Sequence, residues 1–186
     1  MVRAWLVLPQ VMNTIRNAVV GAYGLLVTVA NFLQSPFLLA LRLYFFWQLF
    51  LTGKGKLSNI GKIIDYFTSL GIPAPALNAY FVSALECFGG LLLIIGLASR
   101  PIALMITISM CVAYWTGDHD AVMSIFSDPD KFVQAAPFPF LLTALIVLVF
   151  GPGLLSIDAL LKRWVIGTAS VPFDSSAGRP FRQRNR

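Results

Sequence analysis

The chain has 186 residues, of which 58% are hydrophobic and 12% are charged, whereas about a quarter of the residues of a typical soluble domain are charged. This composition excludes an ordinary water-soluble domain and indicates an integral membrane protein. The 14 basic residues outnumber the 8 acidic ones and give a net charge of +6. Because these charges flank apolar stretches, we interpret them as a topology signal and expect no nucleic acid partner.

The first predicted element is a helix within residues 10–35, which is apolar on one side and polar or small on the other. The second side holds Gln10, Asn13, Asn17, Gly21, Gly24, Thr28, Asn31 and Ser35, within a sector of roughly 80° on a helical wheel. A helix of this kind lies in the membrane interface, although small residues also suit a packed spanning helix. We favour the interface and assign residues 1–35 to an N-terminal amphipathic helix.

Four apolar stretches approach the roughly 17 to 25 residues that a spanning helix needs. They cover residues 36–51, 75–97, 101–116 and 137–150. Between the first two, apolar residues recur at helical spacing over residues 57–70, and Gly71 and Pro73 end that pattern. The predicted fold is therefore an all-α transmembrane bundle of four helices, with an N-terminal amphipathic interfacial helix and a short amphipathic helix between spans 1 and 2.

The connections between the spans differ in charge. Residues 117–136 carry four aspartates and one lysine, whereas Arg100 and the segment after Phe150 are basic. The positive-inside rule then predicts a multi-pass protein with both termini in the cytoplasm and the acidic loop outside. We take residues 36–164 as the membrane domain and residues 165–186, rich in Arg, Ser, Gly and Pro, as a basic disordered tail.

Two ionisable residues lie inside predicted spans, Arg42 in the first and Glu86 in the second. Such groups are costly in a bilayer and need a partner or a function. One interpretation is an Arg42–Glu86 ion pair that fixes the helix register without any chemistry. The other is a pocket in which Arg42, Glu86, Trp47, Gln48 and Trp115 hold a polar head group such as a quinone ring.

His119, the single histidine, lies between Asp118 and Asp120 at the end of the third span. Flanking carboxylates favour its protonated form, so it is a candidate for proton transfer, with a hydrated interfacial histidine as the alternative. We predict no metal site, because one histidine with scattered acids has no ligand spacing. The chain also lacks a haem-binding motif, a flavin fingerprint and a close cysteine pair, which favours a partner subunit as the electron carrier.

Several short motifs occur in a fixed order along the chain. They are Leu41-Arg42-Leu43, Gly53-Lys54-Gly55-Lys56-Leu57, Leu70-Gly71-Ile72-Pro73, Glu86-Cys87-Phe88-Gly89-Gly90, Gly96-Leu97-Ala98-Ser99-Arg100 and Gly151-Pro152-Gly153 followed by Ser156-Ile157-Asp158. With these motifs the chain resembles the DoxX family of small bacterial and archaeal membrane proteins, over about residues 35–164. It departs from the family at Thr52, where many members have histidine, and at residues 134–136, where a polar residue often opens the last span.

The resemblance implies a four-helix membrane bundle in a bacterial inner membrane. It also implies a redox setting, since members are associated with thiosulfate-to-quinone electron transfer and with membrane oxidoreductase complexes that handle thiols. We therefore expect a subunit of a quinone-linked oxidoreductase system, with Arg42 and Glu86 at the quinone and His119 and Glu86 as catalytic groups. The alternatives are a non-catalytic scaffold that recruits a soluble enzyme and a transporter of small molecules or lipids. We expect the lipid bilayer and a soluble or membrane subunit as partners, and a homo-oligomer is also compatible with the sequence.

Overall fold

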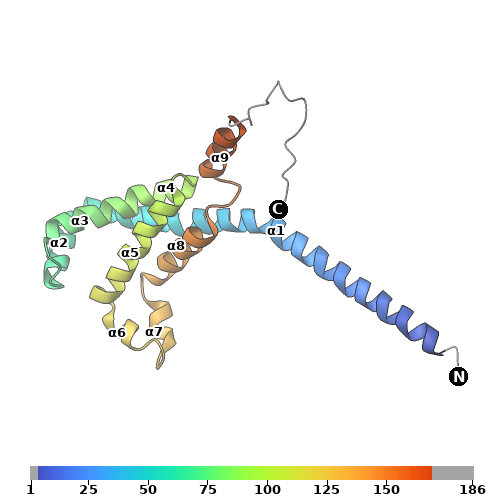
Figure 1. Cartoon of the computed structure of the whole chain (residues 1–186). Helices are drawn as coiled ribbons and strands as arrows, with labels where there is room; N and C mark the ends of the chain where they lie inside the picture. Colours follow the sequence, from blue (N-terminus) through green and yellow to red (C-terminus); the bar gives the residue numbers. More distant parts are fainter. Residues whose placement is uncertain (1–3, 169–186) are drawn as a thin grey trace, which may run out of the picture.

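The computed structural model describes the backbone of residues 4–168 and the side chains of residue 12 and residues 16–164. Its described part contains helices and no strand (Figure 1). The elements are α1 (Ala4–Ser58), α2 (Ile60–Ser69), α3 (Pro75–Ala84), the π-helical turn η1 (Leu85–Gly89), α4 (Gly90–Ile95), α5 (Ser99–Gly117), α6 (His119–Met123), α7 (Pro129–Gln134), α8 (Phe138–Phe150) and α9 (Ile157–Thr168). The predicted all-α class is confirmed.

Helices cover all four predicted spans. The first span lies within α1, the second is formed by α3, η1 and α4 in succession, and α5 and α8 form the third and fourth. Two helical segments, Arg16–Ser58 and Pro75–Ile95, are long and apolar enough to cross a membrane, and α8 is a shorter apolar helix. The short amphipathic helix predicted between the first two spans is α2.

Helix α1 is continuous through the predicted boundary between an N-terminal helix and the first span. The structure differs from the prediction here, since residues 4–58 form one helix with Pro36 inside it. Figure 1 shows that α1 bends between its N-terminal arm and the part that joins the bundle. A proline removes one backbone hydrogen bond and bends a helix without ending it when helix-forming residues follow. That the arm lies in the membrane interface stays a prediction.

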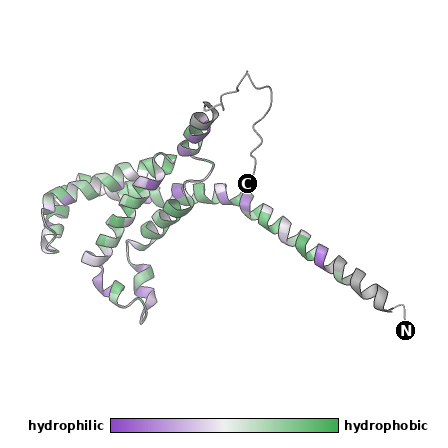
Figure 2. Cartoon of the chain, in the orientation of Figure 1, coloured by the Kyte–Doolittle hydropathy of each residue, from purple (hydrophilic) through white to green (hydrophobic). Residues whose placement is uncertain are grey.

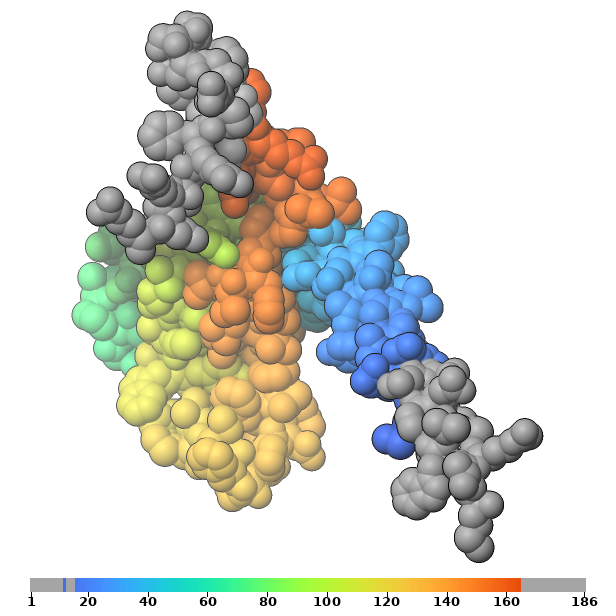
Figure 3. All heavy atoms as spheres, turned by 45° about the vertical axis from the view of Figure 1, so that its right-hand side comes forward, coloured from blue at the N-terminus to red at the C-terminus, as the bar shows by residue number. Residues whose placement is uncertain are grey.

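The arm leaves the helical body, as Figure 3 shows for the blue part of α1. Large apolar side chains along it are exposed, among them Tyr23, Leu26 and Phe32. At the other terminus α9 continues to Thr168, so residues 165–168 of the predicted tail are helical. The remainder of that predicted tail, residues 169–186, lies outside the described residues.

The bundle is built from two antiparallel helix contacts. The second half of α1 packs against η1 and α4, and α5 packs against α8. The core between them consists of Phe46, Leu49, Leu85, Leu93, Ala103, Ile106, Met110, Ala144 and Val147.

Apolar residues also cover the outside of these helices. Ile108, Val112 and Val149, for example, are half or more exposed, and Figure 2 shows hydrophobic residues along the bundle helices and more polar residues around α6 and α7. A helix bundle with apolar residues on its outer faces suits a lipid surrounding.

Candidate functional site

Glu86 lies in the π-helical turn η1, in the middle of the second predicted span. The residue as a whole is 2% exposed, and Oε1 accepts a hydrogen bond from Nζ of Lys56 at 2.6 Å. The other carboxylate oxygen, Oε2, is buried without a hydrogen-bond partner among the described residues. Single π-helical turns inside α-helices occur often at functional sites, because they displace a side chain from the regular register. We therefore take Glu86 as the centre of the candidate site.

Glycines bring α1 close enough to η1 for this contact. A Cβ added to Gly53 would lie 2.3 Å from the backbone nitrogen of Cys87. A Cβ added to Gly90 would lie 3.1 Å from the carbonyl oxygen of Phe46. Small residues of this kind let helix backbones approach in membrane bundles. Lys56 follows Gly53 by one helical turn and thus shares its face, which directs the ammonium group toward Glu86.

Arg42 does not pair with Glu86. Its side chain is fully buried, and its Nη2 donates to the carbonyl oxygen of Leu155 at 2.5 Å. A Cβ added to Gly96 would overlap Nη1 of Arg42 and the side chain of Ser156. Arg42 therefore joins α1 to the α4–α5 turn and to the connection between α8 and α9.

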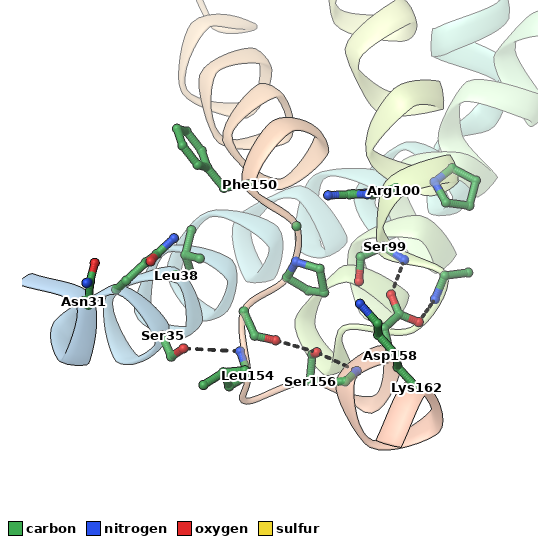
Figure 4. Close-up of a pocket in the computed structure, with 17 residues that line it drawn as sticks. Asn31, Ser35, Leu38, Ser99, Arg100, Phe150, Leu154, Ser156, Asp158 and Lys162 are labelled. Carbon is green, nitrogen blue, oxygen red and sulfur yellow. Dashed lines mark hydrogen bonds between the residues drawn. The ribbon is translucent and has the colours of Figure 1, made fainter. Parts of the chain in front are cut away.

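Asp158 completes the same junction from the first turn of α9. Its two carboxylate oxygens accept the backbone N–H groups of Ala98 and Ser99, each at 2.8 Å (Figure 4). Burial acts to raise the pKa of Asp158, but hydrogen bonds from Ser99 and Ala98 and the charge of Arg42 outweigh it, so the pKa is below its ordinary value. Because Ala98, the N-cap of α5, has no side chain that can accept these hydrogen bonds, Asp158 caps that helix from a distance.

The other predicted site residues do not converge on Glu86. Trp47 and Trp115 are 51% and 61% exposed, and Gln48 and His119 are exposed as well. The His119 ring packs edge-on against Trp115 with 5.0 Å between ring centroids. The structure therefore divides the predicted pocket into the buried Glu86 site, the Arg42 junction and outward-facing side chains.

Lys56 was not among the site residues that we predicted from the sequence, although it lies in the motif Gly53-Lys54-Gly55-Lys56-Leu57. The sequence feature that points to Lys56 is its spacing of one helical turn from Gly53. This spacing is informative only when the glycine lies at a contact with another helix. Within the described residues no group of three or more His, Cys, Asp or Glu side chains forms a metal site.

Comparison with known proteins gives one family. The model of the DoxX family matches residues 37–119. The matched segment contains Arg42, Lys56 and Glu86 and reaches from α1 to the start of α6. No curated protein and no solved structure matches the chain.

Proposed function

Because residues 37–119 belong to the DoxX family, we propose that this small membrane protein is a membrane subunit of a quinone-linked oxidoreductase system of the thiosulfate or thiol type. We propose that the protein resides in a bacterial inner membrane, that its helices cross this membrane four times, and that both termini lie in the cytoplasm. Basic Arg100 and Lys162 at one end of the bundle, and the aspartates of the α5–α8 connection at the other, support that orientation.

The observation that carries the proposal is the half-paired carboxylate of Glu86. A buried acceptor without a partner is costly, by about 1–3 kcal/mol or more for a charged group, and Oε2 is such an acceptor. A hydroxyl donor of a bound molecule would satisfy it, and the ammonium group of Lys56 can donate to a carbonyl oxygen. A quinone head group offers carbonyl oxygens when oxidised and hydroxyl groups when reduced, so it fits both side chains.

Lys56 and Glu86 also place a proton donor, the ammonium group, beside a proton acceptor, the carboxylate. The ion pair is neutral as a whole, which lowers the cost of holding it among apolar helices. The Lys56 side chain is 28% exposed while that of Glu86 is 3% exposed, so the lysine provides the connection to the surface. A bound quinone would supply the two-electron, two-proton acceptor chemistry, and a partner subunit would supply the electrons.

The roles of the other predicted residues change in this proposal. In this proposal Arg42 holds helices together, because its Nη2 donates to the carbonyl oxygen of Leu155 and its Nη1 lies against Gly96. His119 lies outside the Glu86 site, since its side chain is exposed and packs on Trp115. We therefore assign head-group contact to Lys56 and Glu86 and leave Trp47, Gln48 and Trp115 to the lipid-facing surface.

The test is to extract the purified protein with organic solvent and to quantify the quinone by mass spectrometry. The Glu86→Gln and Lys56→Gln variants are compared with Lys54→Gln, which removes an exposed lysine two residues from Lys56. We expect stoichiometric quinone in the unmodified protein and in Lys54→Gln and a loss of most of it in the other two. Absence of quinone from all four proteins, or retention in the folded Glu86→Gln variant, would contradict the proposal.

A second candidate function is a non-catalytic scaffold that recruits a soluble enzyme. The exposed apolar arm of α1 favours it, because no described part of the bundle covers Tyr23, Leu26 or Phe32. In the scaffold case, Glu86→Gln leaves assembly with the partner unchanged and no quinone is found. A transporter of small molecules or lipids would instead show protein-dependent uptake into vesicles.

A further inference from the structure

A groove of about 660 Å³ lies at the end of the bundle opposite the acidic connection. Its walls are α1 around Ser35, the start of α5, the α8–α9 connection and the first turns of α9 (Figure 4). The connection is fixed to α1, since Ser35 Oγ accepts the backbone N–H of Leu154 at 3.2 Å. This groove is separate from the Glu86 site, which contributes none of its lining residues.

Two basic side chains line the groove, Arg100 and Lys162. The Arg100 guanidinium lies beside the backbone of Gly151, where an added Cβ would be 3.7 Å from Nη2. In the part of the chain that the structure describes, neither Arg100 nor Lys162 forms an ion pair. Both are thus available to an anion.

Asp158 also lines the groove, but it does not neutralise it. Both of its carboxylate oxygens already accept backbone N–H groups of α5, each at 2.8 Å. Two cations and one anion leave one net positive charge on the groove walls. Asn31 and Gln34 of α1 add neutral hydrogen-bonding side chains.

The surroundings of the groove are those of a lipid head-group region. Phe150 and Leu154 on its wall are each 63% exposed, so an apolar surface adjoins the two cations. Helix α9 carries exposed Leu160 and Leu161 next to Lys162, which is the composition of a helix lying at a membrane surface.

From this arrangement we propose that the groove binds an anionic phospholipid. The head-group phosphate contacts Arg100 and Lys162, and an acyl chain runs along Phe150 and the outer face of α8. A soluble phosphate would use the two cations alone, whereas a phospholipid also uses the apolar wall. The proposal does not depend on the quinone assignment, because it uses no residue of the Glu86 site.

The experiment is native mass spectrometry of the full chain in detergent, titrated with phosphatidylglycerol or phosphatidylcholine. A basic side chain near anionic lipid contributes about fivefold in affinity. We expect the unmodified protein to prefer phosphatidylglycerol, each of Arg100→Gln and Lys162→Gln to weaken its binding about fivefold, and the double variant to bind both lipids equally. Lys62→Gln, on exposed α2, serves as the matched control and should bind as the unmodified protein does.

A variant that retains the charge separates binding from folding: Arg100→Lys should keep the preference for phosphatidylglycerol. Equal binding of the two lipids by the unmodified protein would overturn the proposal, as would a preference that survives in the double variant. An equal loss in Lys62→Gln would show general charge attraction and would also overturn it. Displacement of phosphatidylglycerol by an equimolar amount of inorganic phosphate would reassign the groove to a soluble anion.

Discussion

Lys56 and Glu86, thirty residues apart in the sequence, form an ion pair of 2.6 Å across the contact between α1 and η1. The pair exists because α1 continues as a helix to Ser58, which carries Lys56 past the predicted end of the first span. The charge of Glu86 is therefore compensated within the bundle. The two side chains depend on the ion pair to different degrees. The Lys56 side chain is 28% exposed and can also be solvated by water, whereas the Glu86 side chain is 3% exposed.

This difference predicts unequal costs for removing either partner. Lys56→Met leaves the buried carboxylate without its cation and should lower the free energy of unfolding by about 3 kcal/mol. Glu86→Gln leaves a lysine that can turn toward the surface, so we expect a smaller loss of about 1–2 kcal/mol. Unfolding in mixed detergent micelles, monitored by circular dichroism, measures both values.

The double variant Lys56→Met/Glu86→Gln is the control for this prediction. Because both charges are gone, it should be more stable than the sum of the single changes implies. Additive losses would mean that the two side chains do not interact in the folded protein.

Gly53 tests the close approach of α1 to η1. Gly53→Ala places a methyl group against the backbone of Cys87, and because backbone cannot move aside like a flexible side chain, we expect a loss of about 2–3 kcal/mol. Gly55→Ala is the matched control in the same helix, since nothing lies within 4 Å of its added Cβ. That change should stabilise the helix by about 0.4–1 kcal/mol. Thermal unfolding in detergent compares the two, and equal shifts would contradict the packing.

The helices could be predicted from the sequence because apolar length is a local property. The four apolar stretches and the amphipathic pattern of residues 57–70 each correspond to helices in the structure. The continuity of α1 could not be predicted, since a proline such as Pro36 can either end a helix or bend it. Whether the helix continues past the proline depends on whether the residues that follow are held in a helix by their packing. In this structure those residues pack against η1 and α4, and the helix continues.

The candidate site was predicted in part. The burial of Arg42 and Glu86 follows from their positions in apolar stretches, and both are buried. Their partners depend on the relative shift of two helices along their axes, which the sequence of each helix does not specify. The contact of Gly53 with the Cys87 backbone fixes that shift and places Lys56, not Arg42, beside Glu86. The rotation of α1 likewise turns Trp47 and Gln48 outward.

Gly96 tests the Arg42 junction. It has a φ of +73°, and an added Cβ would meet Arg42 and Ser156. Gly71 has a similar φ of +68° with open space around it, so Gly71→Ala measures backbone strain alone, about 1–2 kcal/mol. Gly96→Ala should lose clearly more, because it also displaces the guanidinium from Leu155. Denaturation of both variants in detergent gives the comparison, and equal losses would show that the junction tolerates the methyl group.

Asp158 predicts a pH dependence of stability. Its pKa in the folded protein is below the ordinary value because Ser99 and Ala98 donate to its carboxylate. A carboxyl group of this kind stabilises the fold above the unfolded pKa of about 4, and this stabilisation is lost as the pH falls through the lower folded value. At pH 7, Asp158→Asn should cost about 1–2 kcal/mol, because an amide offers one acceptor where two N–H groups need one each.

The direction of this pH dependence is checked by comparing the unfolding temperatures of the Asp158→Asn variant and the unmodified protein at pH 7 and at pH 3. Below about pH 4 the carboxyl group binds a proton in the unfolded chain, whereas in the folded protein it binds one only at a lower pH. The unmodified protein therefore loses stability over this range, and the difference in unfolding temperature between it and the variant should narrow. Asp128→Asn, a change in the acidic connection, is the control and should show little difference at pH 7 because the Asp128 carboxylate is about half exposed and its ion pair with Lys131 is 3.6 Å long. An Asp158→Asn difference that is the same at both pH values would mean that the carboxylate does not cap α5 through its charge.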